Sequence, residues 1–171
     1  MVGLVLTVIG DDRPGLVSSI SAPISAHGAS WERSQMARLA GKFAGIVQVT
    51  VAEDRFDALV ADLTALSADG LQVVFERTDE PAAREPQRMH LDLLGSDHPG
   101  IVAEISACLG DRGVGIEELS TDVRDAPMAG GTLFEAHAVL TTPPATSIEE
   151  LRSLLEALAD ELMVDIKLSE D

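Results

Sequence analysis

Aromatic residues are scarce in this chain of 171 residues: they make up 3% of it, with one Trp and no Tyr. The side chains on which single-stranded nucleic acids stack their bases are therefore largely missing, and we expect an aliphatic core. Basic residues are also few, since 12 Lys and Arg stand against 29 Asp and Glu, for a formal net charge of −17. Because so acidic a surface repels phosphate backbones, we expect no direct binding to nucleic acid.

Cysteine occurs once, at Cys108, which excludes a disulfide within the chain and fits a reducing compartment. Its apolar neighbours favour a small buried residue over a nucleophile. No apolar run approaches the roughly 18 residues of a membrane span. The apolar start of the chain ends at Gly10-Asp11-Asp12 without a preceding basic residue, so it indicates a strand and not a signal peptide. We expect a soluble, cytoplasmic protein without a membrane partner.

Patterns that carry catalysis or metal binding are also missing. The four histidines do not occur at metal-ligand spacing with each other or with Cys108, and no serine has an obvious His or acid partner. We therefore expect no metal, no cofactor and no enzymatic activity. The histidines are His27, His90, His98 and His137.

What the sequence does contain is an internal repeat. The segment LTVIGDDRPGLVSSISAPISAHGAS, from Leu6, aligns without a gap on LDLLGSDHPGIVAEISACLGDRGVG, from Leu91. Between the copies, residues 80–87 contain two prolines and several charges but no large apolar residue, which is typical of a linker. We predict two domains of similar size, 1–79 and 88–171, joined by this linker.

Each copy shows the same succession of hydrophobic patterns. A run of β-branched apolar residues predicts the first strand, and apolar residues that recur every four positions after a proline predict the first helix. Two further strands on either side of a short turn follow, and then a second helix and a last strand. In the first copy we expect strands at 2–9, 31–39, 43–51 and 71–75, and helices at 14–27 and 56–66. In the second copy we expect strands at 89–94, 116–124, 132–141 and 162–168, and helices at 99–112 and 147–160.

This order predicts an α+β fold: two tandem ferredoxin-like βαββαβ domains, each with an antiparallel sheet and both helices on one face. The other face of the sheet is also apolar in sequence, as Val5 and Ile9 illustrate. Such a surface has to be covered, so we expect the two copies to pack together or the protein to form a homo-oligomer such as a dimer.

The turns between the first strand and the first helix of each copy carry the chemical signal. Proline and glycine there open a helix whose first N–H groups and dipole favour an anion such as a carboxylate, and the aspartate beside them suits an ammonium group. Together they describe an amino-acid site. The alternative is that the aspartate only caps the helix. The motifs are Asp12-Arg13-Pro14-Gly15-Leu16 and Asp97-His98-Pro99-Gly100-Ile101.

Two neighbouring side chains leave alternatives open. Arg13 either grips a ligand carboxylate or forms an exposed pair with Asp or Glu, and His98 either lines the second pocket or is a solvated turn residue. The acidic residues of 147–161 form either a solvated helix face or a docking surface for a basic partner.

The strand, the Asp-x-Pro-Gly-hydrophobic turn, Gly28 and the next strand resemble the ACT domain family. That resemblance implies an amino acid held by the motif's polar residue and the turn backbone, at an interface between domains. Many ACT domains place an Asn just after the first helix, where Ser30 and Gly115 stand here. The predicted ligand-binding residues are Asp12, Arg13, Pro14, Gly15, Leu16 and Ser30 in the first copy and Asp97, His98, Gly100 and Ile101 in the second.

Over its full length the chain resembles regulators made of two ACT domains without a DNA-binding module. That resemblance implies a sensor of a small amino acid, with glycine as the proposed signal, that contacts a separate transcriptional activator and so regulates amino-acid or one-carbon metabolism. The alternatives are a detached regulatory subunit of an amino-acid metabolic enzyme and, less favoured by the missing motifs, a small enzyme.

Overall fold

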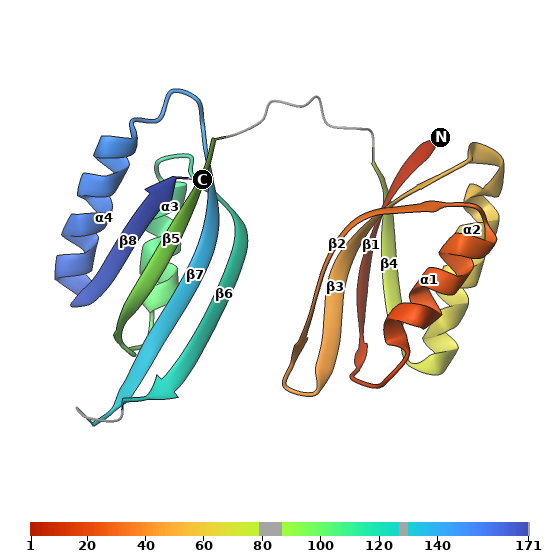
Figure 1. The fold of residues 1–171 in the computed structure, drawn as a ribbon, viewed down its shortest axis with the longest axis horizontal. Helices are drawn as coiled ribbons and strands as arrows, with labels where there is room; N and C mark the ends of the chain where they lie inside the picture. Colours follow the sequence, from red (N-terminus) through yellow and green to blue (C-terminus); the bar gives the residue numbers. More distant parts are fainter. Residues whose placement is uncertain (79–86, 127–129, 171) are drawn as a thin grey trace. The chain divides into compact units, whose positions relative to one another are not determined.

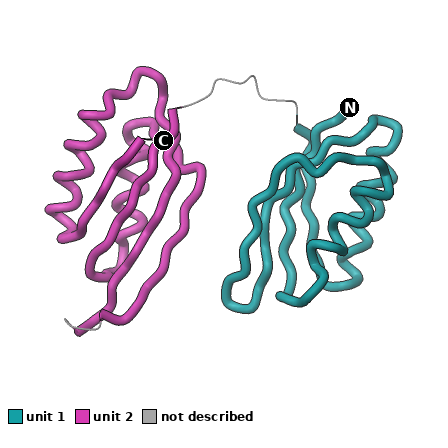
Figure 2. Tube along the Cα trace, viewed as in Figure 1, with its two compact units in different colours: residues 1–83 teal, residues 84–171 magenta. Residues whose placement is uncertain are grey.

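The computed structural model describes residues 1–78, 87–126 and 130–170, and the chain divides into two compact units, Met1–Ala83 and Arg84–Asp171 (Figure 2). Most of the expected linker, residues 80–86, lies outside the described residues, so its exact limits stay a prediction. Gln87, which we expected to end the linker, is the first residue of a strand.

The first unit is a four-stranded antiparallel sheet with the strand order β2-β3-β1-β4 and two helices on one of its faces (Figure 1). Short 3₁₀ turns precede and follow its second helix, at Glu53–Arg55 and Leu66–Asp69. Its strands and helices are β1 (Val2–Asp11), α1 (Leu16–Ala26), β2 (Ser30–Leu39), β3 (Lys42–Val51), α2 (Phe56–Ala65) and β4 (Gln72–Thr78).

The second unit repeats this architecture with the strand order β6-β7-β5-β8. Its elements are β5 (Gln87–Ser96), α3 (Ile101–Gly110), β6 (Gly115–Asp125), β7 (Thr132–Thr142), α4 (Ile148–Leu162) and β8 (Val164–Glu170). The predicted βαββαβ order and the ferredoxin-like fold are confirmed in both halves. Of the Gly-rich loop between β6 and β7, residues 127–129 lie outside the described part of the chain.

Each unit has its own aliphatic core between the helices and the inner face of its sheet. In the first unit, alternate residues of β1 and β3 are buried against apolar residues that recur along α1 and α2. The same arrangement in the second unit uses β5, β7, α3 and α4. The fully buried residues of the first core include Leu4, Leu6, Val8, Ile20, Leu59 and Leu63.

Both first helices begin two residues later than the proline signal indicates. α1 starts at Leu16, and Pro14 lies in the preceding turn. The cause is Gly15, whose backbone is left-handed with φ of +88° and therefore cannot continue a right-handed helix. Gly100 adopts the same conformation, with φ of +95°, before α3.

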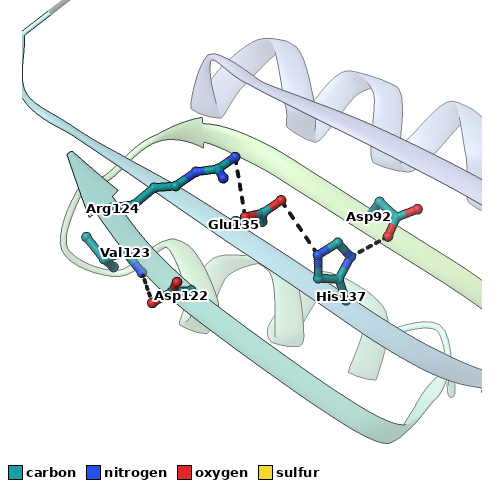
Figure 3. Close-up of polar contacts among 6 residues, drawn as sticks. All are labelled: Asp92, Asp122, Val123, Arg124, Glu135 and His137. Atoms are coloured by element: carbon teal, nitrogen blue, oxygen red, sulfur yellow. Dashed lines mark hydrogen bonds and ion pairs between the residues drawn. The ribbon is translucent and has the colours of Figure 1, made fainter. Parts of the chain in front are cut away.

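The outer faces of the two sheets differ from each other. In the first unit Ile9, Ile46 and Val74 are exposed there, as the sequence predicted. In the second unit the expectation of an apolar outer face is wrong, because polar residues from β5, β6 and β7 form a continuous row across it. That row consists of Asp92, His137, Glu135 and Arg124 (Figure 3).

Candidate functional site

The turn between β1 and α1 leaves the start of the helix open. Gly15 occupies the N-cap position, and among the described residues no side chain caps this end of α1; the Ser19 hydroxyl donates to the Gly15 carbonyl at 3.1 Å. The first helical hydrogen bond runs from the Ser19 N–H to the Gly15 carbonyl, so the N–H groups of residues 16–18 have no partner within the helix. A Cβ at Gly15 would meet no atom within 4 Å. The space beside Gly15 is therefore open.

Asp12 does not cap this helix. Its N–H donates to the Gly41 carbonyl at 2.9 Å, and its carboxylate accepts a hydrogen bond from Nη1 of Arg38 at 3.3 Å. The capping alternative is therefore wrong for Asp12. Instead, the turn is attached to the β2–β3 hairpin, and the carboxylate contacts a cation on β2.

Arg13 forms no ion pair with Asp or Glu among the described residues, and its contact with a ligand stays a prediction. Its Nη2 donates to the backbone carbonyl of Asp69 at 3.1 Å, which joins the β1–α1 turn to the 3₁₀ turn before β4. The guanidinium thus stabilises the shape of the turn. Next to it, the Lys42 ammonium donates to the Asp11 carboxylate and lowers the pKa of that carboxyl group.

Sequence reasoning missed Arg38 and Lys42 as parts of this site. The signal that could have found them is the hairpin register. Leu39 and Lys42 pair across the turn of the β2–β3 hairpin. On its other side β3 pairs with β1, which puts Lys42 opposite Asp11 and Phe43 opposite Gly10. Side chains at the end of the hairpin therefore lie beside the β1–α1 turn.

The second turn has the same backbone but different side chains around it. Gly100 has no side-chain cap beside it, and the Asp97 N–H donates to the Thr132 carbonyl at 2.9 Å. In the described part of the chain nothing hydrogen-bonds to or pairs with the Asp97 carboxylate. The strand positions of Arg38 and Lys42 are taken by Val123 and Leu133, so this aspartate has no equivalent cation.

His98 is turned back on its own turn, with Nδ1 at 3.2 Å from the Pro99 carbonyl oxygen. Pro99 and Gly100 are exposed, whereas Ile101 is buried at the start of α3. Leu16 is likewise buried at the start of α1. The two hydrophobic residues of the motif therefore anchor their helices in the cores and offer a ligand only their backbone.

Ser30 is not brought to the Asp12 turn. It lies opposite Thr50, which pairs with Gly3, whereas the turn follows Gly10 at the other end of β1. Seven residues of strand separate the two levels, about 23 Å at the usual rise. Gly115 has the corresponding place in the second unit, opposite Thr141. Within one unit, Ser30 and Asp12 cannot contact the same small ligand.

The remaining polar groups do not form a second chemical centre. No three His, Cys, Asp or Glu side chains are placed to hold a metal ion within the described ranges. No helix in those ranges is long and apolar enough to cross a membrane. On α4 the acidic side chains are exposed. They are Glu149, Glu150, Glu156, Asp160 and Glu161.

Comparison with known proteins agrees with this architecture. The sequence profile of the ACT domain matches residues 3–76. Over 163 residues, 93% of this chain and 85% of the other protein, the chain is 25% identical to the glycine cleavage system transcriptional repressor of Escherichia coli (strain K12). The resemblance that the turn motifs suggested is thereby confirmed.

Two crystal structures match both halves of the fold together. A protein of unknown function from Galdieria sulphuraria is 32% identical, with a TM-score of 0.87 over 99% of this chain and 98% of that one. A structure provisionally described as a glycine cleavage system transcriptional repressor gives a TM-score of 0.73 over the same shares of the two chains, at 17% identity. The second match supports the tandem fold alone.

Proposed function

We propose that this chain, of which residues 3–76 match the ACT domain family, is a regulatory protein that senses a small amino acid and acts through a protein partner. Its similarity to a transcriptional repressor over most of both lengths supports a role in regulating transcription in amino-acid or one-carbon metabolism. The net charge of −17 favours a protein as the contact, since phosphate backbones are repelled. A free cysteine fits the cytoplasm.

The observation that carries this proposal is the open N-terminus of α1 beside a carboxylate that does not cap it. The N–H groups of residues 16–18 would take the carboxylate of an amino acid, where the helix dipole favours negative charge. The Asp12 carboxylate would take the ammonium group. Arg38 already contacts the Asp12 carboxylate, so the ammonium group of the ligand would share that carboxylate with the Arg38 guanidinium. The same guanidinium would be a nearby cation for the carboxylate of the ligand.

Affinity depends on a second surface that covers the turn. Residues 11–15 are exposed, and each contact at an exposed helix end contributes only about 0.3–1 kcal/mol. A ligand that buries this turn against another surface would gain much more. This requirement supports a homo-oligomer, in which ligand binding would change the surface presented to the partner.

Calorimetric titration of the full chain with glycine and a panel of other amino acids tests the proposal. We expect binding of at least one amino acid and a several-fold weaker Kd for Asp12→Asn, because the neutral amide loses its attraction for ammonium. Asp11→Asn is the matched control, since that carboxylate contacts Lys42 and should leave the Kd unchanged. If no amino acid binds the native chain, or both variants have the native Kd, the proposed site is wrong.

The partner is tested separately by affinity capture from extract of the source cells with and without the amino acid. We expect a DNA-binding regulator among the captured proteins, and no retardation of DNA by this chain alone at physiological salt. Capture of an enzyme of amino-acid metabolism in its place would favour the alternative, a detached regulatory subunit.

A further inference from the structure

The end of the β2–β3 hairpin is attached to the β1–α1 turn by both backbone and side chains. The Asp12 N–H donates to the Gly41 carbonyl at 2.9 Å, and Nη1 of Arg38 lies 3.3 Å from Oδ2 of Asp12. Lys42 adds a contact with the Asp11 carboxylate. The aspartate of the proposed ligand site is therefore also a point of attachment for the hairpin.

This end of the hairpin is a weakly supported part of its sheet. β2 lies at the edge of the sheet (Figure 1), and both Arg38 and Leu39 are exposed. In the turn, Ala40 has a left-handed backbone with φ of +48°, which a residue other than glycine adopts only at an energetic cost. Each contact that attaches the hairpin to Asp12 offsets part of this cost, so loss of one should loosen the last residues of β2.

The weakly supported segment ends where β2 packs against the core. Met36 is partly buried and lies opposite Gly45, where a Cβ would be 2.8 Å from the Met36 Cα. In the second unit the opposed residues at these positions are Thr121 and Ala136. Close packing of the two strands at Met36 limits the segment that depends on Asp12 to residues 37–42.

The second unit keeps the backbone attachment and lacks the side-chain one. The Asp97 N–H donates to the Thr132 carbonyl, as the Asp12 N–H does to the Gly41 carbonyl. Val123, opposite Phe134, has the strand position that Arg38 has opposite Phe43. Because an aliphatic side chain forms no ion pair, this position of β6 has no link to the Asp97 carboxylate. The link is a property of the first repeat and not of the fold.

Arg38 and the ammonium group of an amino acid would bind the same carboxylate. The side chain of Arg38 is 71% exposed and that of Asp12 is 31% exposed, so solvent and a small cation have access to the pair. A second cation on the carboxylate repels the guanidinium and reduces the net charge that attracts it. An exposed guanidinium that leaves Asp12 is hydrated by water, so it gives up little. An ammonium group at Asp12 therefore weakens the Arg38 contact.

We propose that Arg38 couples the Asp12 turn to the edge of the first sheet: an amino acid that binds at the turn weakens the Asp12–Arg38 pair and loosens residues 37–42. The inference rests on the proposed function, because it names the surface that the amino acid changes. The equivalent end of β6 does not respond, since it lacks the cation. Regulation through an edge strand is thus assigned to the first repeat.

Amide hydrogen exchange followed by NMR tests this coupling, because it measures local opening residue by residue. The full chain is compared with and without a saturating concentration of glycine, or of whichever amino acid of the calorimetric panel binds more tightly. We expect faster exchange at residues 37–42 with the amino acid, by about two- to fivefold, the range for loss of an exposed ion pair. Residues 122–125 of β6 should exchange at the same rate in both conditions.

Variants of Arg38 separate its charge from its packing. Arg38→Gln removes the cation and should speed exchange at residues 37–42 without any amino acid, after which the amino acid should cause no further change there. Arg38→Lys keeps a cation and should keep both the protection and the response. Thermal melting checks that each variant is folded.

The second unit offers a matched control. Arg124 lies in the edge strand β6 and pairs with Glu135 at 3.4 Å, so Arg124→Gln also removes one exposed ion pair of an edge-strand arginine. It should leave exchange at residues 37–42 as in the native chain, with and without the amino acid.

The coupling and the amino-acid site fail in different ways. If the native chain binds an amino acid and exchange at residues 37–42 does not change, the coupling is wrong and the site stands. If Arg38→Gln exchanges like the native chain without an amino acid, the pair does not support the strand end and the coupling is again wrong. If no amino acid binds the native chain, the site is wrong and the coupling fails with it.

Discussion

The Asp12 carboxylate lies against the Arg38 guanidinium, with Oδ2 at 3.3 Å from Nη1, and not against the N-terminus of α1. This pair joins the β1–α1 turn to the far strand of the hairpin. It leaves the N-terminus of α1 without a side-chain cap and gives the Asp12 carboxylate a cationic partner. Both consequences can be measured.

Removing the Asp12 carboxylate should change stability little. Asp12→Ala loses one partly exposed ion pair, which contributes about 0–1 kcal/mol, and no helix cap. Ser147 is the contrasting case, since its side chain accepts a hydrogen bond from the Glu150 N–H at the start of α4. Ser147→Ala should cost about 1 kcal/mol. Urea unfolding of both variants measures the difference, and equal losses would contradict the assignment of the caps.

Gly15 should be intolerant of a side chain for conformational reasons alone. Its φ is +88° and the space around a Cβ is empty, so Gly15→Ala should lose about 1–2 kcal/mol from the left-handed backbone without any clash. Gly110, inside α3 with equally open space, is the control. Gly110→Ala should gain about 0.4–1 kcal/mol. Denaturant unfolding that gave the two substitutions the same sign would refute this account.

His137 should titrate above the usual pKa of histidine. Its hydrogen bond with Asp92, in which Nδ1 and Oδ1 are 2.6 Å apart, raises its pKa, and the charge of Glu135 adds to the effect (Figure 3). Since the pKa in the folded state is raised, the pair stabilises the fold fully below about pH 6.5, and this contribution disappears as the pH rises through the folded-state pKa.

NMR titration of the His137 ring in the native chain and in Asp92→Asn measures this shift. We expect a lower pKa in the variant, because the amide cannot hold the imidazolium as a carboxylate does. The same pKa in both proteins would show that the Asp92 contact does not persist in solution.

Cys108 should react slowly with alkylating reagents. Burial is the main reason that the pKa of its thiol is raised, and Asp111 adds to this while Arg112 opposes it. Less thiolate is therefore present near neutral pH than in an unfolded chain. Iodoacetamide should modify the folded protein several-fold more slowly at pH 7.5 than the protein in urea. Equal rates would mean that the thiol is neither buried nor shifted.

Hydrophobic periodicity predicted the elements and the fold because the apolar residues at the periodic positions are the ones that form both cores. The residues at the spacing of Leu16, Ile20 and Ile24 are all buried, and the repeat allowed the second unit to be inferred from the first. The ends of helices were predicted less well. A left-handed glycine at position 15 overrides the preference of Pro14 for the first helical turn, and composition alone does not indicate that conformation.

The surroundings of the site depend on contacts between distant parts of the chain, which local patterns do not encode. Arg38 contacts Asp12 because the register of the β2–β3 hairpin brings the two together, and Arg13 donates to the carbonyl of Asp69, which lies 56 residues further along the chain. The resemblance to ACT domains predicts Ser30 as a ligand-binding residue because it follows the first helix, although the length of α1 carries it to the opposite end of the sheet from Asp12. Strand register, once known, accounts for the positions of Arg38 and Ser30.

The opposed pairs Met36 with Gly45 and Thr121 with Ala136 have a consequence for how such a gene can change. Recombination between two tandem copies can overwrite one strand of a hairpin with its counterpart. Here an exchange of β3 for its counterpart would set Ala at position 45, where a Cβ would lie 2.8 Å from the Met36 Cα and closer still to the Gln35 carbonyl oxygen. The first unit is therefore protected at this position from being overwritten by the sequence of the second.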